Sequence, residues 1–253
     1  MVTPKGSPPP MPKGRRIVVL LSGGLDSTAL LYWAKHQGDR PIALLMDYGQ
    51  RHAKELQAAQ NVARCAAVPF LVHKLTLDLK GNALTDRTVP VPSGPYSEGT
   101  TVSTFVPFRN PLFLSLAAGY ATAIASEGES VSVAIAVHAG DHIAYPDCRQ
   151  EFVEAMRKVL DLGAYKPVPL MTPFVRLTKG EVIRTVEVLG SKPDAAAIPW
   201  GLTWSCYKDL RFHCGVCGTC IERAGAFWEA DVPDPTEYMV PPNLTRIAQE
   251  DKP

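Results

Sequence analysis

The residues best suited to chemistry near the start of the chain form a short glycine-containing loop. Ser22-Gly23-Gly24-Leu25-Asp26-Ser27 lies between an apolar run and a segment with helical spacing. Adjacent glycines let the backbone approach an anion closely, and successive N–H groups at a helix amino terminus attract negative charge. The two serines add hydroxyl donors, while Asp26 fits beside a phosphate if it orients the loop or holds Mg²⁺. The loop therefore predicts a phosphate site, and the alternative is a glycine turn with a helix cap.

A second group with chemical potential lies near the other end of the chain. Cys206, Cys214, Cys217 and Cys220 have seven, two and two residues between them. Four thiolates at this spacing are typical of a closed tetrahedral Zn²⁺ site, which cannot activate water, so we expect a structural metal. Without an export signal, metal binding is favoured over two disulfides, and four ordinary thiols or an iron–sulfur cluster remain alternatives.

The elements that must position these residues alternate between strands and helices. Apolar, β-branched segments predict strands at 17–21, 41–46, 70–77 and 130–137. Apolar residues at helical spacing predict helices at 28–37, 51–68, 111–127, 147–162 and 178–189, with irregular structure from 191 onward. Thr178 and Glu181 predict a capping box, and Gly38 predicts a helix end. This alternation predicts an α/β fold with a doubly wound, Rossmann-like parallel sheet and a C-terminal zinc-binding segment.

Ligands of such sheets bind outside the carboxyl ends of the strands. Three polar segments fall there: 22–27, 47–49 and 138–141. The stretch 80–104 has no periodicity and many Pro, Gly, Ser and Thr residues, so it predicts a lid or binding loop.

Composition sets the broad class of the protein. The 253 residues are 46% hydrophobic, which predicts one globular core. We expect a disordered tail at 1–14, a nucleotide-binding domain at 15–200, and a cysteine segment with a tail at 201–253. The net charge of +1 gives no field to recruit nucleic acid or a membrane surface. The start lacks the apolar stretch of a secretory signal, so we expect a cytoplasmic protein.

The glycine loop resembles that of a known superfamily. It is not a Walker loop, because no Gly-Lys-Ser/Thr follows. Its pattern, Ser-Gly-Gly-x-Asp-Ser, resembles the pyrophosphate loop of the N-type ATP pyrophosphatases, the PP-loop superfamily. The resemblance implies cleavage of ATP between the α and β phosphates and transfer of AMP to an oxygen.

Further motifs narrow the resemblance. They are Asp47-Tyr48-Gly49-Gln50-Arg51-His52, Ser103-Thr104-Phe105-Val106-Pro107-Phe108-Arg109-Asn110, Tyr145-Pro146-Asp147-Cys148-Arg149, Thr172-Pro173, Lys179, Glu181 and Ser205-Cys206-Tyr207. In this order and spacing, from about residue 16 to 227, they resemble the 7-cyano-7-deazaguanine synthase family. Phe108 stands where that family often has Gly, and Ile143-Ala144 stand where it often has Ser-Gly.

The resemblance implies a ligase of queuosine precursor biosynthesis. Such an enzyme uses ATP, Mg²⁺ and ammonia to convert 7-carboxy-7-deazaguanine into 7-cyano-7-deazaguanine, through an adenylated carboxylate and an amide. It also implies bound Zn²⁺ and a homodimer, with no nucleic acid or membrane partner. The alternatives are another PP-loop adenylating enzyme, such as a tRNA-modifying or amide-forming synthetase, and a zinc-containing binding module regulated by nucleotide. A relative that modifies a protein or DNA with the deazaguanine is a third.

Individual roles follow from residue type and place. We expect Ser22, Gly23, Gly24, Leu25, Asp26, Ser27 and Asp47 to bind ATP and its metal. We expect Asp26, Arg109, Lys179 and Asp141 to act in catalysis, and Phe105, Arg109, Asp141, Tyr145 and Asp147 to bind the substrate. The competing interpretations are a strand-end turn for Asp47, surface ion pairs for Arg109 and Lys179, a helix cap for Asp147, and core packing for the two aromatic residues. His52, His138 and His142 rank lower as acid–base groups.

Overall fold

The computed structural model describes residues 14–51, 53–77, 79–140, 145–193, 195–208 and 210–245. Its centre is a five-stranded sheet in the order β3-β2-β1-β4-β5, in which every neighbouring pair is parallel. The strands are β1 (Arg16–Leu20), β2 (Arg40–Asp47), β3 (Phe70–Lys74), β4 (Ser132–Ala134) and β5 (Leu170–Met171). The chain leaves β1 toward β2 on one side and returns to β4 on the other, so the doubly wound prediction is confirmed.

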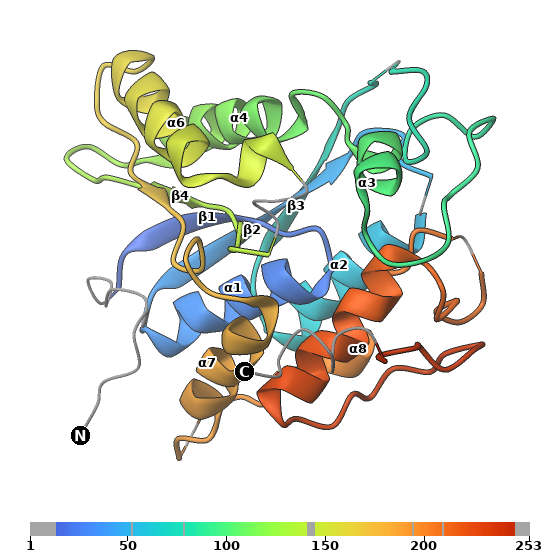
Figure 1. The fold of residues 1–253 in the computed structure, drawn as a ribbon. Coiled ribbons are helices and arrows are strands. Elements are labelled where there is room, and N and C mark those ends of the chain that lie inside the picture. The colour runs from blue at the N-terminus through green and yellow to red at the C-terminus, as the bar shows by residue number, and fades with distance from the viewer. Residues whose placement is uncertain are drawn as a thin grey trace.

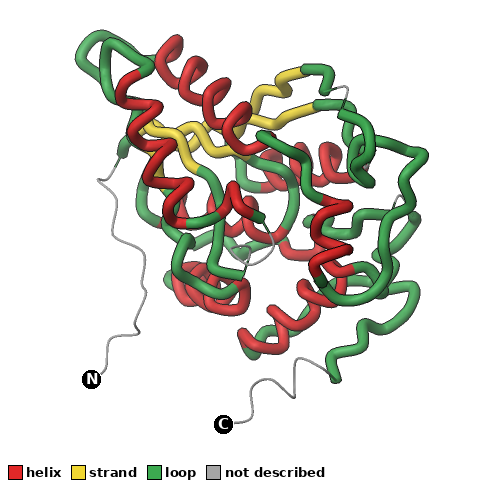
Figure 2. Tube along the Cα trace, turned by 45° about the horizontal axis from the view of Figure 1, so that its top comes forward, coloured by secondary structure: helices red, strands yellow, loops and turns green. Residues whose placement is uncertain are grey.

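Helices cover both faces of this sheet (Figure 1). One face carries α4 (Arg109–Ile124) and α6 (Gln150–Leu162). The other carries α1 (Leu25–His36), α2 (Ala53–Cys65), α7 (Lys179–Gly190) and α8 (Gly218–Ala230). The short elements are α3 (Glu98–Thr104), η1 (Pro146–Cys148) and η2 (Trp200–Leu202). Figure 2 shows the strands enclosed between helices, with long loops gathered on one side of the molecule.

The alternation of side chains along β1 divides the core into two parts. Ile17 and Val19 point to the face of α1, and Val18 and Leu20 point to the face of α4. All four are buried, as expected for a central parallel strand. The strand that leads into the glycine loop is therefore held from both sides.

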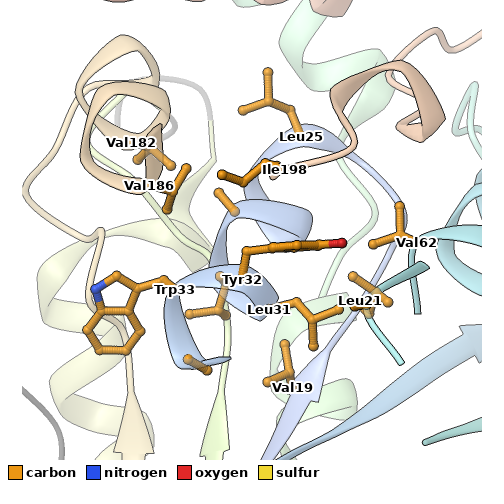
Figure 3. Close-up of a cluster of buried hydrophobic side chains, with 14 of the residues drawn as sticks. Val19, Leu21, Leu25, Leu31, Tyr32, Trp33, Val62, Val182, Val186 and Ile198 are labelled. Atoms are coloured by element: carbon orange, nitrogen blue, oxygen red, sulfur yellow. The ribbon is translucent and has the colours of Figure 1, made fainter. Parts of the chain in front are cut away.

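Helix α1 lies between the sheet and α7, so it is buried nearly all round. Figure 3 shows Leu31, Tyr32 and Trp33 of this helix within the cluster, near Val182 and Val186 of α7. The Trp33 and Phe174 rings meet edge to face, with centroids 6.2 Å apart. The helix that begins in the glycine loop thus has little freedom to shift.

Several element ends follow their predicted signals, while others differ. Thr178 and Glu181 form the predicted capping box, and Gly38 has a φ of 82° just after α1. Helix α1 begins at Leu25, three residues earlier than predicted, because Gly24 serves as its N-cap. Strands β3 and β4 are shorter than predicted, and β5 and α3 were not predicted.

The prediction of irregular structure from 191 onward is wrong for α8. The inward residues of this helix recur at helical spacing: Cys220, Arg223, Gly225, Ala226, Phe227 and Ala230. Because that stripe includes an arginine, a cysteine and a glycine, it does not resemble an apolar stripe in the sequence. Within the described ranges, no helix combines the length and apolarity needed to cross a membrane.

Arg223 of α8 holds the C-terminal segment together from inside. Its side chain is 1% exposed, and its guanidinium donates to the Trp200 carbonyl at 3.0 Å and to the Thr203 hydroxyl at 2.7 Å. It also donates to Thr236 at 2.6 Å and lies 3.8 Å from the carboxylate of Asp234. One buried cation therefore joins three separate stretches of chain, and its removal leaves their polar groups unsatisfied.

We expect Arg223→Leu to lower the free energy of unfolding by about 3 kcal/mol, because buried acceptors lose their donor. The matched control is Arg176→Leu at an exposed position, with an expected change below about 0.5 kcal/mol. Urea unfolding followed by fluorescence measures both. Equal midpoints for the two variants would contradict the structural role of Arg223.

Candidate functional site

A pocket opens at the carboxyl ends of β1, β2 and β4, where the strand order reverses. Its lining includes the glycine loop, the ends of β2 and β4, the amino terminus of α4, and residues from the cysteine segment. Ligands of doubly wound sheets bind at this point of the topology. The pocket is therefore where the fold and the predicted motifs agree.

The glycine loop is held by its two serines and by close packing against α2. The hydroxyls of Ser22 and Ser27 lie 3.0 Å apart, and the Ser27 hydroxyl accepts from the Ser22 N–H at 3.2 Å. Gly23 has a φ of 88°, and a Cβ there would lie 2.4 Å from the Ala59 nitrogen and 2.5 Å from the Glu55 carbonyl oxygen. Only glycine satisfies both demands at this position.

A cluster of positively and negatively charged side chains lies beside the glycine loop. The Lys179 ammonium lies 3.2 Å from Asp26 Oδ2 and 2.6 Å from Glu222 Oε2. The fully buried His138 places its Nε2 3.7 Å from Asp26 Oδ1. Lys179 is the first residue of α7 and Glu222 lies on α8, so this cluster connects the loop with both outer helices.

Arg109 forms the second cationic centre of the pocket. Burial alone lowers the pKa of Arg109, but the nearby Tyr48 and Asp147 raise it more, so its guanidinium stays charged. Glu55 in the first turn of α2 also lines the pocket. Burial raises the pKa of Glu55 to about 7, against the opposing influence of Arg109 and the Ser22 hydroxyl.

Aromatic side chains line part of the pocket. The Tyr145 ring stacks on Phe105 at 6.3 Å and meets Tyr96 edge to face at 6.2 Å. The Tyr145 hydroxyl is 3.0 Å from the Thr104 hydroxyl, and the Tyr96 hydroxyl is 3.3 Å from that of Tyr207. The three tyrosines therefore offer aromatic ring surface and hydroxyl groups to a flat polar ligand.

The structure gathers most predicted site residues around this pocket. Those that line it are Ser22, Gly24, Leu25, Asp26, Ser27, Arg109, Tyr145 and Lys179. Those that do not are Gly23, which packs on α2, Asp47 at the end of β2, Phe105 behind Tyr145, and Asp147. Asp141, His52, His142 and Ile143-Ala144 lie outside the described residues.

Asp147 is buried beneath the pocket wall. Its backbone carbonyl accepts from the Asn110 side chain at 3.2 Å, and burial raises the pKa of its carboxyl group. It does not cap α6, whose N-cap is Arg149, because η1 comes between. Its place beside Arg109 lets it orient that side chain.

Phe108 immediately precedes Arg109 and has an unusual backbone. Its φ is 57°, in the left-handed region, and its side chain is 79% exposed. A bulky residue in this region costs about 1–2 kcal/mol. The backbone therefore turns sharply directly before Arg109, although the residue at the turn is not glycine.

Sequence analysis assigned no role to several side chains that line the pocket. Asn110 and Tyr207 stand in the quoted motifs, whereas Glu55, Tyr96, Thr219 and Glu222 do not. Tyr96 belongs to the predicted lid at 80–104, so that segment does reach the pocket. Glu55 lies three residues after a motif that had been noticed, while Glu222 could not be found from its neighbours, because α8 was not predicted.

The four clustered cysteines form a compact, buried group. All four Sγ atoms lie within 4.8 Å of one another. Backbone N–H groups of Lys208 and Cys214 donate to Cys206 Sγ, each at 3.4 Å, and those of Val216 and Cys217 donate to Cys214 Sγ at 3.4 and 3.3 Å. The geometry fits one metal ion with four sulfur ligands.

The cysteine segment also supplies a wall of the pocket. Trp204 donates its backbone N–H to the Gly23 carbonyl at 2.9 Å, and Cys206 and Thr219 line the cavity. The Lys54 ammonium lies 4.7 Å from the centre of the Trp204 ring and bonds to the Leu210 carbonyl. The metal centre and the glycine loop are therefore parts of one structural unit.

Comparison with known proteins agrees with this geometry. A family model described as "Queuosine biosynthesis protein QueC" matches residues 16–231. The 7-cyano-7-deazaguanine synthase of Caldicellulosiruptor saccharolyticus is 42% identical over 227 residues, covering 89% of this chain and 96% of that protein. The enzyme of the same name from Rhizobium meliloti is 43% identical over 231 residues, covering 89% and 93%. The chain therefore belongs to the QueC family of queuosine biosynthesis proteins.

Proposed function

We propose that this chain is an ATP-dependent ligase that converts 7-carboxy-7-deazaguanine and ammonia into 7-cyano-7-deazaguanine. The observation that carries the proposal is a single pocket that is lined both by the glycine loop and by tyrosine rings and the Arg109 side chain. Relatives that match 89% of this chain and bear this activity as their name support the choice of substrate. We also propose that the acting unit is a homodimer, which the resemblance to the family implies.

The reaction explains why the phosphate-binding loop and the aromatic residues must line the same pocket. A carboxylate is a poor electrophile, because its leaving group would be oxide, and transfer of AMP provides a better one. The backbone of residues 22–27 would hold the phosphates, and Arg109 would pair with the carboxylate of the base, as guanidinium groups do. Stacking on Tyr145 would orient the flat ring.

The site also fits a divalent cation beside the phosphates. Asp26 Oδ1 is buried and has no hydrogen-bond partner among the residues that the structure describes. A carboxylate oxygen is the ligand that Mg²⁺ prefers, and the ion would neutralise charge on the triphosphate. Asp26 would hold the ion, with Lys179 fixing the second carboxylate oxygen. Asp47 does not line the pocket, so we assign it no metal contact.

The cysteine group fits structural Zn²⁺, held by Cys206, Cys214, Cys217 and Cys220. Four sulfur ligands leave no open position, so the ion would stabilise the fold and take no part in the reaction. Because Cys206 also lines the pocket, zinc would fix the wall that carries Trp204 and Tyr207.

The first test is the reaction itself. With ATP and ammonium, we expect AMP and pyrophosphate to form only when 7-carboxy-7-deazaguanine is present, because adenylation needs its carboxylate. Mass spectrometry should show the amide and then the nitrile. Absence of both products, or ATP cleavage without the base, would overturn the proposed function.

We expect Asp26→Asn to lower the rate of substrate-dependent ATP–pyrophosphate exchange by about 100-fold or more, because the charge beside the phosphates is lost. The zinc content, measured by atomic absorption, should stay unchanged because the cysteines are untouched. The control is Asp161→Asn at an exposed position of α6. Normal exchange in the Asp26 variant would remove this residue from the ATP site.

We expect Cys217→Ser to lose zinc and to lower the melting temperature by at least about 10 °C, since the metal contributes to folding. The matched control is Cys65→Ser, which changes an exposed cysteine outside the cluster. Metal analysis and thermal unfolding measure both. A metal-free Cys217 variant with an unchanged melting temperature would contradict the structural role.

A further inference from the structure

One ionisable group in the pocket has no role in the mechanism described so far. Glu55 lines the cavity from α2, close to Ser22 of the glycine loop and to Arg109 of α4. Its backbone carbonyl is one of the atoms that prevent any side chain at Gly23. Glu55 is therefore fixed relative to the phosphate loop by direct packing, while its carboxylate stays inside the pocket.

We infer that Glu55 is the general base that removes protons from the attacking nitrogen. The inference rests on the proposed function, because that reaction creates a specific need for such a group. Geometry supports it: the Glu55 carboxylate lines the pocket beside Ser22 of the loop that would hold the phosphates, and it interacts with the Arg109 guanidinium that would hold the carboxylate of the base. The reacting carbon must lie between the same two groups.

Proton balance shows why a base is needed. When ammonia attacks the adenylate, the new C–N bond forms as the C–O bond to AMP breaks, and the nitrogen must lose one proton. When the amide oxygen then attacks a second ATP, pyrophosphate leaves and the nitrogen loses another proton. In the last step the nitrogen loses its remaining proton as the C–O bond to AMP breaks and the nitrile forms. Each proton can pass to Glu55 and from there to water.

The surroundings of Glu55 suit this task. The groups that interact with its carboxylate are Arg109 from α4, the Ser22 hydroxyl from the glycine loop and Tyr48 after β2. Burial raises the pKa of its carboxyl group to about 7, which suits a group that must both accept and release a proton near neutral pH. The Asp26–Lys179–Glu222 cluster, in contrast, is internally paired.

The test is Glu55→Gln, which keeps the size of the side chain and removes the base. We expect substrate-dependent ATP–pyrophosphate exchange to stay within about threefold of the unaltered chain, because adenylation releases no proton from nitrogen. Amide formation from ammonium should fall by about 100-fold or more. The control is Glu154→Gln on the exposed side of α6, which should change neither rate.

The pH dependence adds a readout that a purely structural role would not move. In the unaltered chain, amide formation at saturating free ammonia should fall with one proton as pH drops below about 7, because the carboxyl group is then protonated. Glu55→Gln should lack this limb, and Glu55→Asp should keep it with a lower kcat.

The outcomes separate the two proposals. If the unaltered chain shows no exchange with the carboxylated base, the proposed function fails. If it shows exchange but Glu55→Gln makes amide normally, or loses exchange and amide formation together, the role of Glu55 as a base is overturned. A persistent acidic limb in Glu55→Gln would overturn it as well.

Discussion

The contact between Gly23 and helix α2 is the constraint on which the site depends. The loop must turn with a φ of 88° directly against the backbone of Glu55 and Ala59. There is no room for a side chain, so the path of the loop is set by the position of α2. Because β1 is packed on both faces, the strand before the loop cannot yield either. The N–H groups of residues 22–27 are therefore arranged before any anion arrives, and binding does not need to order them.

Preorganisation extends to the charged groups of the pocket. Lys179 lies between two carboxylates, and Asp147 sits beside Arg109, so neither cation needs a ligand to hold its position. These groups are supplied by α1, α4, α7, α8 and η1, and the four longer helices lie on both sides of the sheet. The two halves of the core must pack together for the charges to meet, and this links the stability of the fold to the electrostatics of the pocket.

Much of the fold and of the pocket could be predicted from the sequence. The elements that were not predicted depend on contacts between distant parts of the chain, which local sequence patterns do not contain. Residues 17–27 carry a buried strand, a glycine turn and a helix start in order, so both fold and ligand class could be inferred from one segment. Strand β5 is only two residues long and forms because β4 is already present, so no local pattern marks it. Helix α8 turns Arg223 and Cys220 inward, and their burial depends on partners distant in sequence.

Local sequence patterns also fail to identify some of the individual side chains of the site. Asp26 could be predicted because it stands in the glycine loop, and Lys179 because it belongs to the motifs that carry the family resemblance. Glu222 became visible only once α8 was placed against α7, and Glu55 only once α2 was placed against the glycine loop. Asp47, chosen for its place at a strand end, does not line the pocket, since position along a strand does not fix the direction of a side chain. Contacts between elements, rather than motifs, complete the pocket.

The order in which the pocket wall is synthesised has a consequence for the cell. Trp204, Tyr207 and Glu222 come from the last fifth of the chain, whereas the glycine loop comes from the first ninth. A nascent chain on the ribosome can form the early strands and the loop long before these residues emerge. The cavity is closed only when translation is nearly complete, so a truncated product from a stalled ribosome would carry the loop without the wall that shields a reactive adenylate from water.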